Sequence, residues 1–354
     1  MKRVLGLLVI FVLLVCATAG VGVYTAYQKA TEPYKGYPGD EIFFTVTPGQ
    51  AGASIARALE AEGIARDHRL FVAALWFKKA TGRLQAGEYR FTKPASTMKV
   101  IDRLVDGDIY SQSVTIPEGL TVSETAEHLA EKGIGDVGAF RAAFGRSDLI
   151  ASLDPEASDL EGYLFPETYQ FPRQPAPEEV ARALTARFIQ FFDEDRLAKA
   201  ASLDLDVREV VTLASIVEKE TGQAEERPLI ASVFWNRLNR RMALQSDPTI
   251  IYELKRQGRY DGNLRQDDLK LDAPYNTYRF PGLPPGPIAS PGLAAIDAVL
   301  SPPETKYLYF VSKNDGSHYF SRTLREHTNA VRKYQIEYFR QKRRERQKKK
   351  AGVS

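Results

Sequence analysis

Cysteine and histidine are scarce in this chain of 354 residues. The single cysteine, Cys16, lies in an N-terminal apolar stretch, so the rest of the chain has no disulfide, no cysteine zinc ligand and no thiol nucleophile. The four histidines lack the spacing of a metal hydrolase, and we predict no metal site and no cofactor. His318, beside Tyr319 and Phe320, is better interpreted as a packed or hydrogen-bonded residue.

Charge is distributed unevenly along the chain. Hydrophobic residues make up 44% and charged residues 26%, a globular composition that excludes collagen-like and wholly disordered proteins. The stretch Glu337–Lys350 holds eight Lys or Arg and two Glu, and Lys2 and Arg3 add two more cations, so the body between them is slightly acidic. Such a body is not expected to bind nucleic acid. We interpret the tail as a solvated helix end, with attraction to anionic lipid or acidic wall polymer as the alternative.

The N-terminus predicts a membrane anchor. Val4–Tyr24 has no charged residue and, as a helix, is about 30 Å long, enough to cross the hydrocarbon core of a bilayer. The cations before it favour a cytoplasmic N-terminus. The alternative is a cleaved signal peptide, since Ala17–Ala19 resembles a cleavage site, but the apolar run continues beyond it. Both interpretations export the body, and we predict a single-pass protein of the bacterial inner membrane with most of the chain in the periplasm.

Two short βα patterns follow the anchor. Ile42–Val46 reads as a strand, followed by a Pro-Gly turn and a short amphipathic helix that ends at Gly63. The same order returns at Ser113–Gly133, where Thr121 and Glu124 fit a capping box. These units resemble LysM modules, which bind glycan. The alternative is a structural domain that only spaces or docks the rest of the chain.

The predicted fold class is α+β. Residues 159–169 read as a short polar and aromatic linker that leads to a long helix, Glu178–Phe192, and a last domain begins near Asp204. The predicted organisation is a cytoplasmic tip (1–3), a transmembrane anchor (4–24), a spacer (25–41), a small LysM-like βα domain (42–150), a linker with a connecting helix (151–203), a mixed α+β catalytic domain (204–338) and a basic tail (339–354).

Two carboxylates stand in the first helix of that last domain, predicted over Val207–Thr221. Glu218 and Glu220 are two residues apart, about 200° around the axis, so they cannot both face one cleft. Glu218 follows a small and apolar stripe near the helix C-terminus, where desolvation and the helix dipole should both raise its pKa, as a general acid requires. Glu220 is then a structural partner for Arg227 or Arg237. The alternative is that both glutamates are ordinary solvated residues.

Several later segments suit the recognition of sugar rings, and none is specific alone. Together, and in this order, they resemble the endolytic murein transglycosylase family, also called YceG-like. The segments that carry the resemblance are Glu161–Tyr169 (EGYLFPETY), the Glu218 helix, Gln245–Thr249 (QSDPT), Tyr275–Tyr278 (YNTY), the loop Gly282–Ile288 (GLPPGPI), and the strands Tyr307–Val311 and His318–Phe320.

The resemblance implies an enzyme that cuts the β-1,4 bond between N-acetylmuramic acid and N-acetylglucosamine within glycan strands, leaving 1,6-anhydro ends. It implies Glu218 as the one catalytic acid and base. Gln245, Asp247, Asn276 and Tyr278 would hold saccharides or orient Glu218. The expected partner is the peptidoglycan strand, and peptidoglycan synthases are candidate protein partners. The alternatives are a non-catalytic, membrane-tethered peptidoglycan-binding scaffold and a glycosidase that uses water.

Overall fold

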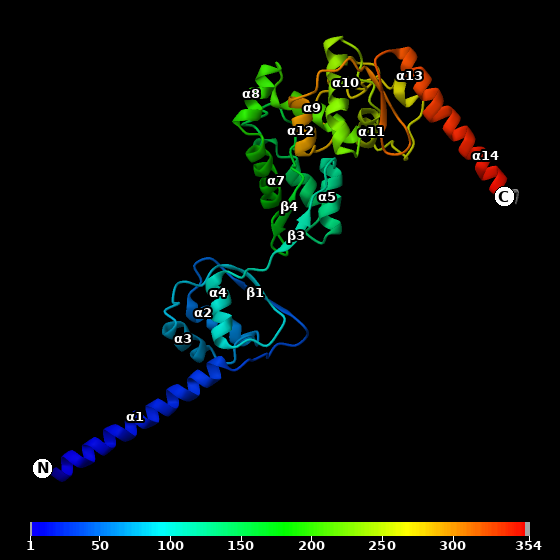
Figure 1. Cartoon of the computed structure of the whole chain (residues 1–354). Helices are drawn as coiled ribbons and strands as arrows, with labels where there is room; N and C mark the ends of the chain where they lie inside the picture. Colours follow the sequence, from blue (N-terminus) through cyan, green and yellow to red (C-terminus); the bar gives the residue numbers. More distant parts are fainter. Residues whose placement is uncertain (1, 351–354) are drawn as a thin grey trace. The chain divides into compact units, whose positions relative to one another are not determined.

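The computed structural model describes residues 2–350 and divides into two compact units, Met1–Gln112 and Ser113–Ser354 (Figure 1). The division falls earlier in the chain than the predicted boundary after residue 150. The reason is that β3 (Gln112–Thr115) pairs with β4 (Thr168–Phe171), so the segment after it joins the second unit. Val114 accordingly packs in the core that the second unit's helices form.

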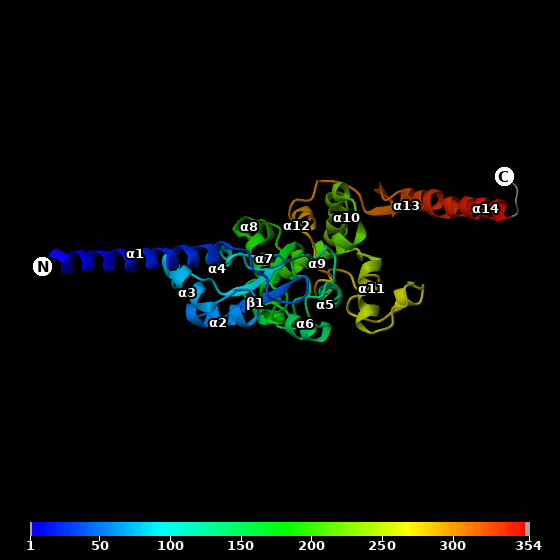
Figure 2. The same cartoon turned by 90° about the horizontal axis from the view of Figure 1, so that it is seen from below.

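The first unit begins with one long helix, α1 (Lys2–Thr31), seen from two sides in Figures 1 and 2. Among the described residues, Ile10–Thr31 is the one helical stretch long and apolar enough to cross a membrane. The helix continues past the predicted anchor into the first part of the predicted spacer. A helix of this length and composition is compatible with a single-pass anchor.

The rest of the first unit is a βααβα arrangement. Its elements are β1 (Ile42–Val46), α2 (Gly52–Ala61), α3 (His68–Phe77), β2 (Gly87–Phe91) and α4 (Thr97–Asp106). The two strands pair antiparallel with Phe44 opposite Tyr89, and the predicted strand at Ile42–Val46 is confirmed. Asp67 caps α3 by accepting backbone N–H groups from the helix's first turn. The LysM-like character of this unit stays a prediction.

The described part of the second unit is mainly helical, with two small two-stranded sheets. Its helices are α5 (Val122–Glu131), α6 (Val137–Phe144), α7 (Pro177–Phe191), α8 (Glu194–Ser202), α9 (Val207–Glu220), α10 (Arg227–Asn239), α11 (Asp247–Arg256), α12 (Leu293–Leu300), α13 (Leu324–Val331) and α14 (Tyr338–Lys350). A π-helical turn, Arg332–Glu337, joins α13 to α14. Most of the predicted basic tail is helical, because α14 extends to Lys350. β5 (Tyr309–Ser312) pairs antiparallel with β6 (His318–Ser321).

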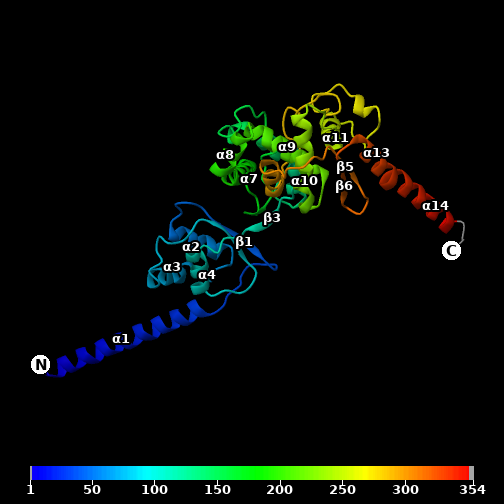
Figure 3. The same ribbon diagram turned by 45° about the horizontal axis from the view of Figure 1, so that its top comes forward.

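Helix α9 is the centre of this unit. Every residue from Val210 to Glu218 is buried, and α8, α10, α11 and α12 all pack against this helix. Figure 3 shows α9 among the helices of the second unit. The helix starts sharply because Asp206 and Glu209 form a capping box. A helix enclosed on most of its sides holds its side chains in fixed positions, which is what a catalytic group on it needs.

The predicted linker at residues 159–169 is wrong. Leu160, Tyr163 and Leu164 are almost fully buried in the core, and the Tyr163 hydroxyl donates a 2.5 Å hydrogen bond to Asp154. The polar residues between them suggested a solvated linker. In the folded chain those polar groups are satisfied by neighbours, so the segment is part of the second unit's framework.

Candidate active site

Glu220, the last residue of α9, lies at the wall of a pocket of about 400 Å³. It is partly buried, and its Oε1 accepts a 2.6 Å hydrogen bond from the Ser246 hydroxyl. Ser246 directly precedes α11, so the bond ties the end of α9 to the start of α11. The pocket is lined by Glu220, Arg237, Leu244, Gln245, Asp247, Tyr278, Tyr309, Phe310, Leu324 and His327.

The environment of Glu220 favours the protonated carboxyl. Burial, and to a lesser degree the negative charge of Asp247, raise the pKa of Glu220 to about 7, while the Ser246 hydrogen bond and the Arg237 charge oppose the rise. A carboxyl with such a pKa is present in both forms near neutral pH. It can therefore donate a proton in one step and accept one in the next.

Three of the predicted saccharide-binding residues line this pocket. The Tyr278 hydroxyl donates a hydrogen bond to Asp247 Oδ1, which fixes both side chains on one wall. Gln245 is exposed, and its backbone has a φ of 52°, a strained left-handed conformation for a residue other than glycine. The structure thus brings Gln245, Asp247 and Tyr278 together, and brings them to Glu220.

Asn276 does not line the pocket, contrary to the prediction. Its side chain is fully buried, and its amide donates hydrogen bonds to the carbonyl oxygens of Leu269 and Leu271, at 3.1 and 2.7 Å. Its Oδ1 accepts the backbone N–H of Tyr278 at 3.0 Å. Asn276 therefore holds the loop that carries Tyr278, and its contacts leave no room for a saccharide.

Glu218 is not among the residues that line this pocket, and its carboxylate has other partners. Its Oε1 accepts a 2.7 Å hydrogen bond from Arg227, and its Oε2 accepts the backbone N–H of Gly292 at 3.0 Å. The two side chains are only 5% and 10% exposed, so this is a buried ion pair. The same guanidinium nitrogen also contacts Glu118 at 2.9 Å. Burial and repulsion by Glu218 raise the pKa of Glu118.

Of the two arginines predicted as partners of Glu220, Arg237 is near it and Arg227 is not. Arg227 pairs with Glu218, whereas Arg237 is the cation near Glu220. The two glutamates have different neighbours, as expected for residues about 200° apart around the helix axis. Glu220 lines the pocket, and its pKa is raised to about 7.

Residues 44–333 match the YceG-like family, a span that covers most of the chain. The chain belongs to the YceG-like family. A relative in Bacillus subtilis (strain 168), an endolytic murein transglycosylase, is 30% identical over 341 residues, covering 88% of this chain and 90% of the relative.

Other relatives of this YceG-like chain agree. An endolytic murein transglycosylase of Streptococcus pneumoniae serotype 2 is 31% identical over 91% of this chain, which spans 64% of that longer relative. The crystal structure of a yceG-like protein from Listeria monocytogenes is 29% identical, with a TM-score of 0.56, and covers 82% of this chain and 98% of that one.

Arg237, Tyr309 and His327 of this YceG-like chain also line the pocket, although the sequence indicated no role in saccharide binding for them. Arg237 is buried, and its guanidinium lies over the ring of Tyr309. The ring of His327 stacks on the ring of Tyr309, with the ring centroids 5.1 Å apart. Within residues 2–350, the buried Nδ1 of His327 has no hydrogen-bond partner. Burial and the Arg237 charge lower the pKa of His327, which favours the neutral ring. These residues come from three separate elements, so no local pattern joins them.

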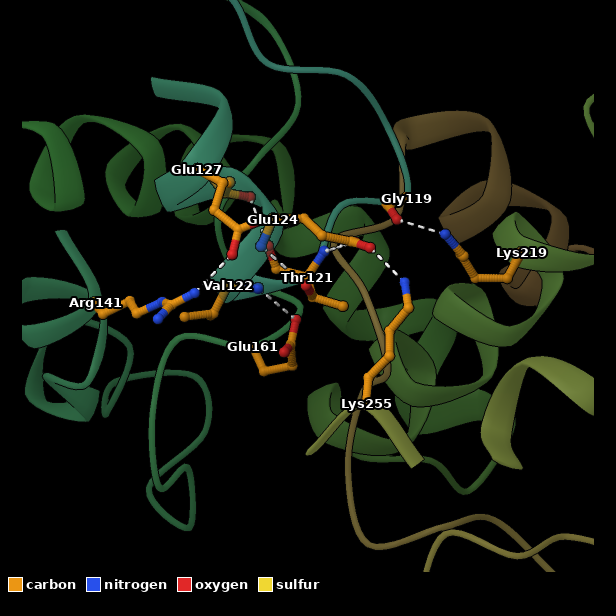
Figure 4. Close-up of polar contacts among 10 residues, drawn as sticks. Gly119, Thr121, Val122, Glu124, Glu127, Arg141, Glu161, Lys219 and Lys255 are labelled. Atoms are coloured by element: carbon orange, nitrogen blue, oxygen red, sulfur yellow. Dashed lines mark hydrogen bonds and ion pairs between the residues drawn. The ribbon is translucent and has the colours of Figure 1, made fainter. Parts of the chain in front are cut away.

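A second cavity of about 550 Å³ lies beside α5 and the C-terminal end of α11. Figure 4 shows its polar wall, where Lys255 pairs with Glu124 and Arg141 with Glu127, each at 2.6 Å. Glu161 accepts the backbone N–H of Val122 at 3.1 Å. These contacts satisfy the charges around the cavity and tie the EGYLFP segment to α5.

Because of Glu161, the stability of the folded chain should depend on pH. Its burial raises its pKa from an ordinary 4.5 to about 8. Between these two values the folded chain binds more protons than the unfolded chain, so the free energy of unfolding should fall as the pH rises through this window. Glu161→Gln removes the titration. We expect its melting temperature, measured by differential scanning fluorimetry, to equal the wild type near pH 5 and to exceed it above pH 8. An offset that does not change with pH would contradict this expectation.

Among residues 2–350, the side chains of Glu60, Asp67 and His68 are close enough together to hold a metal ion. Glu60 and His68 pair with each other at 2.6 Å, and Asp67 is occupied as the N-cap of α3. We assign no metal to these surface residues. His318 pairs with Glu226 and packs on aromatic rings, which confirms its interpretation as a packed, hydrogen-bonded residue.

Proposed function

We propose that this chain is a membrane-anchored endolytic murein transglycosylase. Its substrate is the glycan strand of peptidoglycan, cut between N-acetylmuramic acid and N-acetylglucosamine to leave a 1,6-anhydro end. The family and the activity of its curated relatives support the reaction class. The observation that supports the mechanism is a carboxyl with a pKa of about 7, Glu220, in a polar and aromatic pocket.

The reaction needs only one carboxyl group. Protonated Glu220 donates its proton to the glycosidic oxygen as the bond from C1 of the muramic acid to that oxygen breaks. The C6 hydroxyl of the same sugar then forms a new bond to C1 and gives its proton to the Glu220 carboxylate. Ordinary glycosidases need a second carboxylate to activate water or to act as nucleophile. Here no water is consumed, and the enzyme ends in its starting protonation state.

The pocket walls suit this chemistry. Asp247 and Tyr278 offer hydrogen-bonding groups held by their own contact, and Gln245 offers an exposed amide. The neutral ring of His327 stacks on Tyr309 in the same wall. Sugar hydroxyl and acetamido groups are the kind of ligand that such a wall binds. We assign Glu218 to the framework behind the pocket, through its pair with Arg227.

Helix α1 supports the anchoring part of the proposal. We propose that it crosses the inner membrane with its basic N-terminus in the cytoplasm and the rest of the chain on the outer side, where murein lies. A protease added to the outside of spheroplasts should digest both units and leave α1 protected. A digestion that requires lysis would contradict this orientation.

Mass spectrometry of murein sacculi incubated with the purified chain tests the activity. The proposal predicts internal fragments that end in 1,6-anhydro-N-acetylmuramic acid. Reducing ends would instead indicate a water-using glycosidase, in which Asp247 could serve as the second carboxylate because it shares the pocket. Murein binding without any release of fragments would leave only a tethered scaffold.

A further inference from the structure

Helix α3 has two apolar faces. Phe71, Ala74 and Leu75 are buried in the core of the first unit. The opposite face is exposed and runs along the helix at spacings of three and four residues, through Val72, Ala73, Trp76 and Phe77. Trp76 is 79% exposed and Phe77 is 68% exposed. A soluble protein rarely places two such large apolar side chains in water side by side.

This exposed face adjoins the outer end of α1. An apolar groove of about 250 Å³ is formed between the two helices within the first unit. It is lined by Val23, Ala26, Tyr27 and Ala30 of α1, by Leu70, Ala73, Ala74, Trp76 and Phe77 of α3, and by Met98 of α4. The exposed rings of α3 therefore continue the apolar surface of α1.

The predicted anchor, Val4–Tyr24, places this groove at one face of the bilayer. From Val4 to Val23 the helix rises about 29 Å, close to the roughly 30 Å thickness of a hydrocarbon core. Val23 and Tyr27 would then lie at the outer boundary of the bilayer. Trp76 and Phe77, beside them, would lie at the same level, where tryptophan and tyrosine side chains concentrate in membrane proteins.

We propose that α3 lies in the outer interface of the membrane, with Val72, Trp76 and Phe77 inserted among the lipids next to α1. The proposal rests on the membrane anchoring proposed above. The exposed cations Arg69 and Lys79, at the two ends of the helix, would then meet lipid phosphates. The first unit is thus attached to the membrane surface by a second contact and does not swing freely on α1.

The two tryptophans of the chain allow a direct test, because one lies in each unit. Trp235→Phe leaves Trp76 as the only tryptophan, and Trp76→Phe leaves Trp235, whose indole donates a 2.9 Å hydrogen bond to Val299 inside the second unit. Each full-length variant is reconstituted in phosphatidylcholine–phosphatidylglycerol vesicles with or without lipids brominated near the top of the acyl chains. Circular dichroism and flotation of the vesicles establish that each variant is folded and anchored.

We expect bromination to lower the Trp76 emission by about half, since an interfacial helix buries its apolar face about 5–10 Å into the headgroup and acyl boundary. The Trp235 emission should not change. If the chain floats with the vesicles but bromination leaves the Trp76 emission unchanged, the proposal is wrong. Trp76 would then be in water or covered by another part of a protein. A chain that fails to float overturns the anchoring itself.

Discussion

Replacement of Glu220 with glutamine should lower the rate of anhydro-product formation by about 10²–10⁴-fold, the usual contribution of a general acid and base. The amide has the shape of the protonated carboxyl and can still accept the Ser246 hydrogen bond, so fold and stability should be retained. The rate is measured as anhydro ends released per enzyme from sacculi. Binding of the variant to insoluble murein should equal that of the wild type.

Glu218→Gln is the matched control, because it makes the same chemical change two residues away on the same helix. The pocket residues are not in contact with its carboxylate, which lies against Arg227 and Gly292. We expect this variant to retain most of its rate per folded molecule. The opposite pattern, an active Glu220→Gln and an inactive Glu218→Gln, would return the catalytic role to Glu218.

Replacement of Arg227 with methionine should destabilise the chain by about 3–5 kcal/mol, the usual cost of leaving a buried charge without its partner. The change removes the cation that lies between Glu118 and Glu218 and leaves the two carboxylates facing each other. Denaturant unfolding monitored by circular dichroism measures the effect. Arg141→Met, which breaks the half-exposed pair with Glu127, is the control and should change little.

A double variant distinguishes the repulsion between the Glu118 and Glu218 carboxylates from the loss of packing at Arg227. Adding Glu218→Gln to Arg227→Met removes one of the two facing charges, so the double variant should be more stable than Arg227→Met alone. If Arg227→Met unfolds at the same denaturant concentration as the wild type, the pair does not hold the framework as described.

Local signals in the sequence were sufficient for many of the elements. The capping box at Thr121 and Glu124 is present, and the helix predicted from Val207 begins there because Asp206 caps it. Residues 159–169 were misjudged because no periodicity distinguishes a buried irregular segment from a linker. Their burial comes from packing with other elements, such as α7 and α9, which local patterns do not reveal.

The same limit applies to the site. The sequence correctly predicted that Glu218 and Glu220 face different neighbours, and it identified Gln245, Asp247 and Tyr278, which share one pocket. It could not tell which glutamate faces them, because that depends on how α10 and α11 pack against α9. The small, apolar stripe that carries Glu218 was compatible with a packed or a cleft-lining position, and in the fold it is buried. Asn276 was misassigned because a buried amide and a sugar-binding amide look alike in sequence.

The account depends on Glu220 holding its proton near neutral pH. The most direct measurement is a carbon-13 NMR titration of the side-chain carboxyls in the full chain labelled at glutamate, with the Glu220 signal assigned by its absence from Glu220→Gln. The account predicts a midpoint near 7. A midpoint near the ordinary value of 4.5 would mean that Glu220 is ionised at neutral pH and cannot be the acid that starts the reaction.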